Sequence, residues 1–266
     1  MTKLSLTLLS LALALSGAIS AQPLSKERAT PAFYQRDKGA GFANQGREYC
    51  APTSISNGLL YLAQARGMAR LVDGSGHDAQ VRLIKELASL MATDPKIGTS
   101  PDKILTGLRK YVAAKGFQFR TLELSSWRSV TKANKSFKVG SKPNLSWITR
   151  AVEDPDSVVV FNVGWYDWKD DQEVYFRKGG HWITVVGAGP AQSEFHVHNP
   201  SLTPQAQAEK ISVKLKQVDK DFSVMGSNEE EKNMAGYYQV SGPGLPYNSE
   251  VRTAVLDSVI VFSLRH

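Results

Sequence analysis

Hydrophobic positions recur with a helical period in the first half of the chain. Three amphipathic segments show this pattern: residues 50–66, 78–92 and 101–115. Ser100 immediately before the third segment is a typical helix cap, and Gly116 after it is a typical stop signal. The pattern therefore predicts three helices, of which the first begins at Cys50.

The pattern changes to short apolar and β-branched runs further along the chain. Such runs are typical of strands, and they cover residues 117–124, 158–161, 173–177, 182–186, 195–198, 211–215, 237–240 and 259–262. Residues 144–153 are expected to form a short helix, and the polar residues 219–235 a solvated loop. Helices followed by strands predict an α+β fold with an antiparallel sheet.

The N-terminus has the three parts of a secretory signal peptide. Lys3 precedes an apolar run from Leu4 to Ile19, and small residues lead to the polar pair Gln22-Pro23. We expect cleavage after Ser20 or Ala21, which leaves residues 1–21 as the signal peptide and 22–43 as an extended lead-in. The run is too short for a membrane span, and no second long run follows. An exported protein, periplasmic or extracellular, is predicted.

Composition and charge narrow the class of protein. The 266 residues are 42% hydrophobic and 21% charged, which is enough for a sizeable core and excludes disorder. The formal charge of +7 is compatible with an anionic partner, but the basic residues are dispersed among acids. Without zinc-finger spacing or an aromatic-basic signature, no nucleic-acid partner is expected. No cofactor or metal ion is predicted, because His196-x-His198 alone is a weak metal signal.

The single cysteine, Cys50, is unusual for an exported chain. It is incidental, intermolecular or a reactive thiol. The free N–H groups at a helix start stabilise a thiolate, so its place favours a reactive thiol with a pKa below the ordinary value of about 8.5. The commoner role of a free cysteine is that of a small buried hydrophobe.

A thiol nucleophile needs a base, and His181 is the best placed of the five histidines. It follows Gly179-Gly180 and opens the predicted buried strand 182–186. His77 in a glycine-rich loop and the C-terminal His266 are expected to be solvated. Asn199, followed by Pro200, comes eighteen residues after His181, at the end of another predicted strand.

These segments resemble those of papain-like cysteine peptidases. Gly180-His-Trp-Ile-Thr-Val-Val-Gly-Ala-Gly189 is similar to their histidine strand, and Asn199-Pro200 falls where an Asn or Asp orients the imidazole. Cys50-Ala-Pro-Thr-Ser resembles the Cys-Gly-Pro-x-Ser form of C39-like peptidases and, more distantly, of phytochelatin synthases. The resemblance implies a papain-like fold over residues 44–266, with a helix-rich half that carries the cysteine helix packed on an antiparallel sheet half. Residues 201–266 form an unassigned β extension.

The resemblance also implies roles for four residues. Cys50 would be the nucleophile, His181 the base, Asn199 the residue that orients the imidazole, and Gln45 a donor to the oxyanion. The usual separation of six residues before the cysteine would select Asn44 instead of Gln45. We therefore expect an exported peptidase that hydrolyses peptide bonds, without predicting its oligomeric state. An acyl transferase, a cell-wall amidase and a non-catalytic binding protein are the alternatives.

Overall fold

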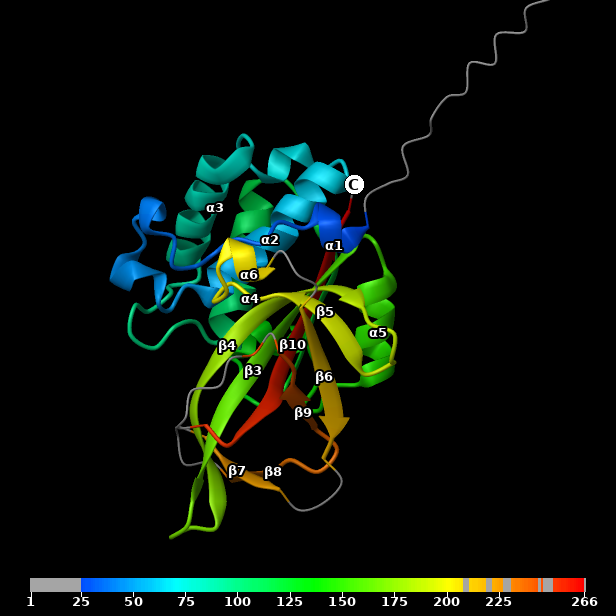
Figure 1. Cartoon of the computed structure of the whole chain (residues 1–266). Helices are drawn as coiled ribbons and strands as arrows, with labels where there is room; N and C mark the ends of the chain where they lie inside the picture. The colour runs from blue at the N-terminus through cyan, green and yellow to red at the C-terminus, as the bar shows by residue number, and fades with distance from the viewer. Residues whose placement is uncertain are drawn as a thin grey trace, which may run out of the picture.

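The computed structural model describes residues 25–207, 211–218, 222–226, 231–243, 245 and 251–265, so the predicted signal peptide lies outside the described residues. The helices are α1 (Lys26–Ala29), α2 (Cys50–Ala65), α3 (Gly76–Leu90), α4 (Pro101–Ala114), α5 (Leu145–Glu153) and α6 (Pro204–Gln207). The strands are β1 (Phe119–Ser126), β2 (Lys138–Gly140), β3 (Ser157–Lys169), β4 (Val174–Ala188), β5 (Glu194–His198), β6 (Ser212–Gln217), β7 (Ser223–Met225), β8 (Glu231–Asn233), β9 (Tyr238–Ser241) and β10 (Thr253–Leu264). Figure 1 shows α2, α3 and α4 together in the upper part of the view, with most of the strands below them.

Six of the strands close into an antiparallel barrel. The order around it is β3, β4, β5, β6, β9 and β10, and β10 pairs with β3 to complete the ring. Strands β1, β2, β7 and β8 extend the sheet outside this ring. The predicted papain-like arrangement of a helical half on a sheet half is therefore wrong. A barrel pairs both edges of each strand, which satisfies backbone groups that an open sheet leaves exposed.

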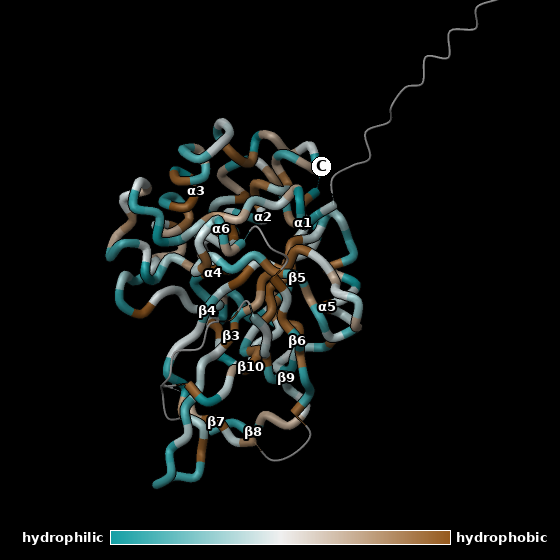
Figure 2. The backbone as a smooth tube through the Cα atoms, viewed as in Figure 1, coloured by the Kyte–Doolittle hydropathy of each residue, from teal (hydrophilic) through white to brown (hydrophobic). Residues whose placement is uncertain are grey.

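Alternate residues of the barrel strands face two different cores. Along β3, Val158 and Val160 pack among the helices, whereas Val159 and Phe161 point into the barrel and contact residues of α5 and the other barrel strands. This alternation is the expected two-residue period of a strand with both faces covered. Figure 2 shows the resulting concentration of hydrophobic residues along the central strands.

Helix α2 lies in the core between the other helices and the barrel. Gly58 allows this close approach, because a Cβ atom there would lie 2.3 Å from a methyl carbon of Val158 on β3. Helix α4 begins as predicted, with the Ser100 hydroxyl accepting a hydrogen bond from the Lys103 amide, and Gly116 follows its end with a φ of +76°. No helix in the described part of the chain is both long and apolar enough to cross a lipid bilayer.

A buried ion pair and its hydrogen bonds link three strands of the barrel. Asp257 on β10 is fully buried, and one of its carboxylate oxygens lies 2.7 Å from Nε of Arg177 on β4. The other oxygen accepts hydrogen bonds from the Tyr166 hydroxyl on β3 and from the Trp127 indole, at 2.7 and 3.0 Å. Both oxygens of the Asp257 carboxylate therefore have polar partners, which a buried charge requires.

Several predicted element boundaries differ from those observed. The predicted strands 173–177 and 182–186 are parts of one continuous strand, β4. The predicted loop 219–235 contains β7 and β8 within its described residues. The short helix α1 interrupts the predicted extended lead-in, because Ser25 caps it and Glu27 lies in its first turn.

Candidate active site

Cys50 is the first residue of α2, and its side chain is buried, with 6% of the residue exposed. Burial raises the pKa of the thiol to about 11, although the backbone amide of Trp182 and those of Ala51 and Cys50 itself hydrogen-bond the sulfur and favour the thiolate. The charge of Glu48 adds to the rise in pKa. The thiol of the free protein is therefore held protonated, in contrast to the lowered pKa that the helix position alone predicts.

Two hydrogen bonds fasten the first turns of α2 to strand β4. The Ser54 hydroxyl donates to the carbonyl of Trp182, and the Thr184 hydroxyl donates to the carbonyl of Ser54, each at 2.9 Å. Ser54 lies one helical turn after Cys50, on the same face of the helix. These bonds keep the thiol against the amide of Trp182, the residue that directly follows His181 on β4.

His181 is held in one tautomer by a chain of hydrogen bonds. The side-chain oxygen of Asn199 lies 2.7 Å from His181 Nε2 and also accepts the backbone N–H of Ser201 at 2.9 Å. Because an amide nitrogen could not accept from the Ser201 amide, the atom facing Nε2 is the oxygen, and Nε2 must carry the proton. Nδ1 of His181 is therefore the basic nitrogen.

The imidazole is neutral at ordinary pH. Burial lowers the pKa of His181 from 6.5 to about 4, against the opposing effect of its hydrogen bond to Asn199. Cys50 thus carries a protonated thiol and His181 a neutral imidazole on adjoining elements, since the Trp182 amide that hydrogen-bonds the sulfur belongs to the residue directly after His181.

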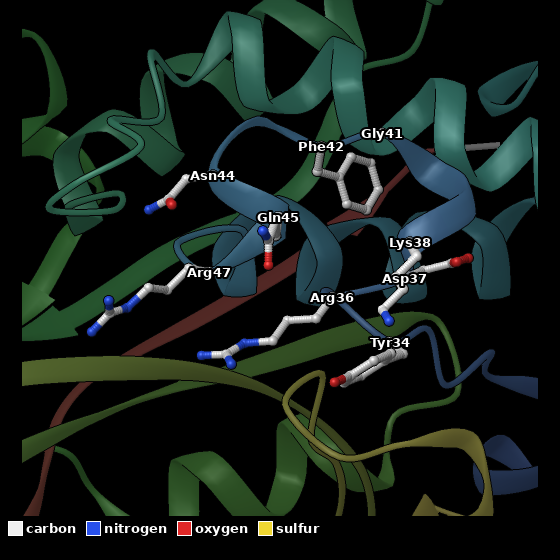
Figure 3. A pocket seen from close by; sticks show the side chains of 9 residues that line it. All are labelled: Tyr34, Arg36, Asp37, Lys38, Gly41, Phe42, Asn44, Gln45 and Arg47. Atoms are coloured by element: carbon white, nitrogen blue, oxygen red, sulfur yellow. The ribbon is translucent and has the colours of Figure 1, made fainter.

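The segment before α2 has an unusual backbone. Asn44, Gln45 and Gly46 all have left-handed φ angles, of 47°, 52° and 72°. The Asn44 side-chain amide donates to the carbonyl of Pro95 at 2.9 Å, and Asn44 and Gln45 both line a cleft that lies just ahead of α2 (Figure 3). Because the hydrogen bond to Pro95 engages the Asn44 amide, Gln45 stays our candidate for the oxyanion donor.

Gln35 is a site residue that sequence reasoning missed. Its side-chain amide donates to the carbonyls of Gly46 and Arg47, at 3.0 and 2.8 Å. Its backbone N–H donates to the carbonyl of Pro200 at 2.8 Å, and its side-chain oxygen accepts from the Ser201 hydroxyl at 3.5 Å. Gln35 thus ties the loop of Gln45 to the loop that orients His181. Nothing in the polar lead-in distinguishes this glutamine from a solvated one.

The other histidines have separate partners. His198 Nδ1 donates to the carbonyl of Pro31 at 3.1 Å and holds the N-terminal segment against β5. His77 bonds Asp37 and Asp78, and His266 lies outside the described residues. Among the residues that the structure describes, no three His, Cys, Asp or Glu side chains are grouped so that they could hold a metal ion.

No protein-family model matches this chain, and no curated protein matches it in sequence.

Proposed function

We propose that the protein is an exported cysteine peptidase that hydrolyses peptide amide bonds. The observation that supports this function best is the placement of the Cys50 thiol against the strand that carries His181, whose basic nitrogen is fixed by Asn199. The resemblance of the segments around these residues to those of cysteine peptidases supports the same function.

In the proposed reaction, the thiol proton of Cys50 passes to Nδ1 of His181 as the sulfur attacks the amide carbon. The electron pair of the carbonyl moves to its oxygen, which the Cys50 amide and the Gln45 side chain stabilise. Collapse of this intermediate expels the amine, which takes the proton from His181, and leaves a thioester on Cys50. His181 then takes a proton from a water molecule as the water oxygen attacks the thioester carbon. The C–S bond breaks, the acid is released, and the proton on His181 returns to the sulfur to restore the thiol.

A peptide library incubated with the protein, with products identified by mass spectrometry, tests the proposal. We expect cleavage by the wild-type protein, none by Cys50→Ala, and a loss of roughly 10²- to 10⁴-fold in kcat/KM for Asn199→Ala, because the imidazole loses its fixed tautomer. His196→Ala on β5 is the matched control and keeps full activity. Cleavage that persists in a folded Cys50→Ala protein contradicts the proposal.

Acyl transfer to an amine is a second candidate, favoured by one observation. Cys50 and His181 are 6% and 8% exposed, so the site limits the access of water to a thioester. Adding glycinamide to the library reaction distinguishes the two functions. A transferase yields the glycinamide adduct as its main product, whereas a hydrolase yields free acids at the same rate with and without the amine.

A further inference from the structure

A cleft of about 940 Å³ lies beside Gln45, just ahead of the cysteine helix. Its lining includes the cations Arg36, Lys38 and Arg47 together with Gln45. Figure 3 shows the guanidinium groups of Arg36 and Arg47 extending to the same side of the Gln45 amide. The cleft therefore gathers three cations next to the group that we assign to the oxyanion site.

Among the described residues, the acids near this cleft form no close hydrogen bond with the two arginines. Asp37 also lines the cleft, but its carboxylate is 2.5 Å from Nε2 of His77 and points away from the arginines in Figure 3. The closest approach of Glu48 to Arg47 is 3.7 Å, beyond a strong hydrogen bond. Asp94, whose charge also acts on Glu48, accepts hydrogen bonds from the backbone amides of Lys96 and Ile97. Within the described chain, the guanidinium groups of Arg36 and Arg47 donate no hydrogen bond to another residue.

Arg36 and Arg47 already act on one carboxylate together. Burial raises the pKa of Glu48, and the charges of Arg47 and Arg36 both oppose that rise. Both charges therefore act on the same carboxylate, and Figure 3 shows the two guanidinium groups on the same side of the Gln45 amide. A guanidinium group binds a carboxylate through two parallel hydrogen bonds, which a pair of exposed arginines can provide from two sides.

We propose that this cleft binds a carboxylate of the peptide substrate close to the scissile amide, with Arg36 and Arg47 as the donors. The inference rests on the proposed function, because it specifies the substrate of that same site. The carboxylate comes from an Asp or Glu side chain or from the C-terminus of the peptide. Tyr34 and Phe42, which also line the cleft, add aromatic surface that suits a peptide.

The test measures binding separately from turnover. Fluorescently labelled alanine-based hexapeptides, with Glu or Gln at each position in turn and a C-terminal amide, are titrated into Cys50→Ala protein. A further alanine peptide carries a free C-terminal carboxylate. We expect at least one Glu peptide, or the free-acid peptide, to bind roughly tenfold tighter than its uncharged counterpart, as charge-assisted hydrogen bonds require.

Three variants made in the Cys50→Ala protein locate the effect. Arg36→Gln with Arg47→Gln removes the preference for the carboxylate, whereas Arg252→Gln, an arginine of similar exposure elsewhere, preserves it. Glu48→Gln strengthens the preference, because it removes a competing acid. Equal binding of charged and uncharged peptides, absent binding, or equal loss in Arg252→Gln overturns the inference.

The two proposals fail in different ways. Arginine-dependent binding of the carboxylate without any cleavage by the wild-type protein supports the cleft assignment and contradicts the peptidase. Cleavage without a preference for a carboxylate supports the peptidase and contradicts the cleft assignment.

Discussion

Burial determines the protonation of the two central residues of the candidate site. It raises the pKa of Cys50 to about 11 and lowers that of His181 to about 4, so both groups are neutral in the free protein. The amides of the helix start and of Trp182 favour the thiolate, but their effect is smaller than the cost of burying a charge. In the proposed reaction, activation of the thiol therefore requires proton transfer to His181 rather than a preformed ion pair.

Alkylation of Cys50 by iodoacetamide should report this protonation. We expect the alkylation rate to rise from pH 8 towards the pKa of about 11. The midpoint of this profile therefore lies at a higher pH than that of an ordinary thiol. Glu48→Gln should move the profile to lower pH, since the Glu48 charge raises the pKa of the thiol. Glu153→Gln, an exposed acid on α5, should leave it unchanged. A midpoint below pH 8 in the wild-type protein would show a stable thiolate instead.

At the scale of single elements, local signals were sufficient to predict the helices. Ser100 and Gly116 mark the ends of α4, and Pro52 within the first turn marks the start of α2 at Cys50. The position of Cys50 at a helix start was therefore predictable. The role of Gln35 was not, because it depends on contacts with Gly46 and with the loop after β5, which its neighbours in sequence do not encode.

The packing of α2 on β3 should depend on Gly58. A methyl group at this position would lie 2.3 Å from a carbon of Val158, so Gly58→Ala should lower the free energy of unfolding by about 1–3 kcal/mol through overpacking. Combining it with Val158→Ala removes the clash and should recover part of the loss. Urea denaturation of both proteins and of Val158→Ala measures the coupling. Additive effects of the two substitutions would contradict this packing.

At the scale of the whole molecule, closure of the barrel was beyond sequence reasoning. Closure is made by the pairing of β3 with β10, two segments that are distant in sequence, and the ion pair of Arg177 with Asp257 likewise joins distant strands. The order of His181 and Asn199 along the chain was recognisable, and the structure brings these two side chains together because β4 and β5 are adjacent antiparallel strands. The hydrophobic pattern of a single segment does not indicate which distant strand it pairs with.

The buried imidazole also links the candidate site to the acid stability of the whole fold. The pKa of His181 is about 4 in the folded protein against 6.5 for an ordinary histidine, so between these values only the unfolded chain binds the proton. Stability is therefore lost as the pH falls from 6.5 to 4, by about 3 kcal/mol for this group. His198, whose pKa burial also lowers, acts in the same direction.

Urea denaturation at pH 7 and pH 4 should show this loss in the wild-type protein and a smaller one in His181→Gln. His77→Gln is the control, because the contribution of His77 to stability changes with pH in the opposite direction to that of His181. Hydrogen bonds to Asp37 and Asp78 raise the pKa of His77, so its contribution is fully present at low pH and lost as the pH rises through its folded pKa. His77→Gln should therefore lose more free energy of unfolding between pH 7 and pH 4 than the wild-type protein. The contrary result is that the wild-type protein and His181→Gln lose the same free energy of unfolding between pH 7 and pH 4. His181 would then bind a proton as readily in the folded protein as in the unfolded chain, and this result would contradict a buried neutral base.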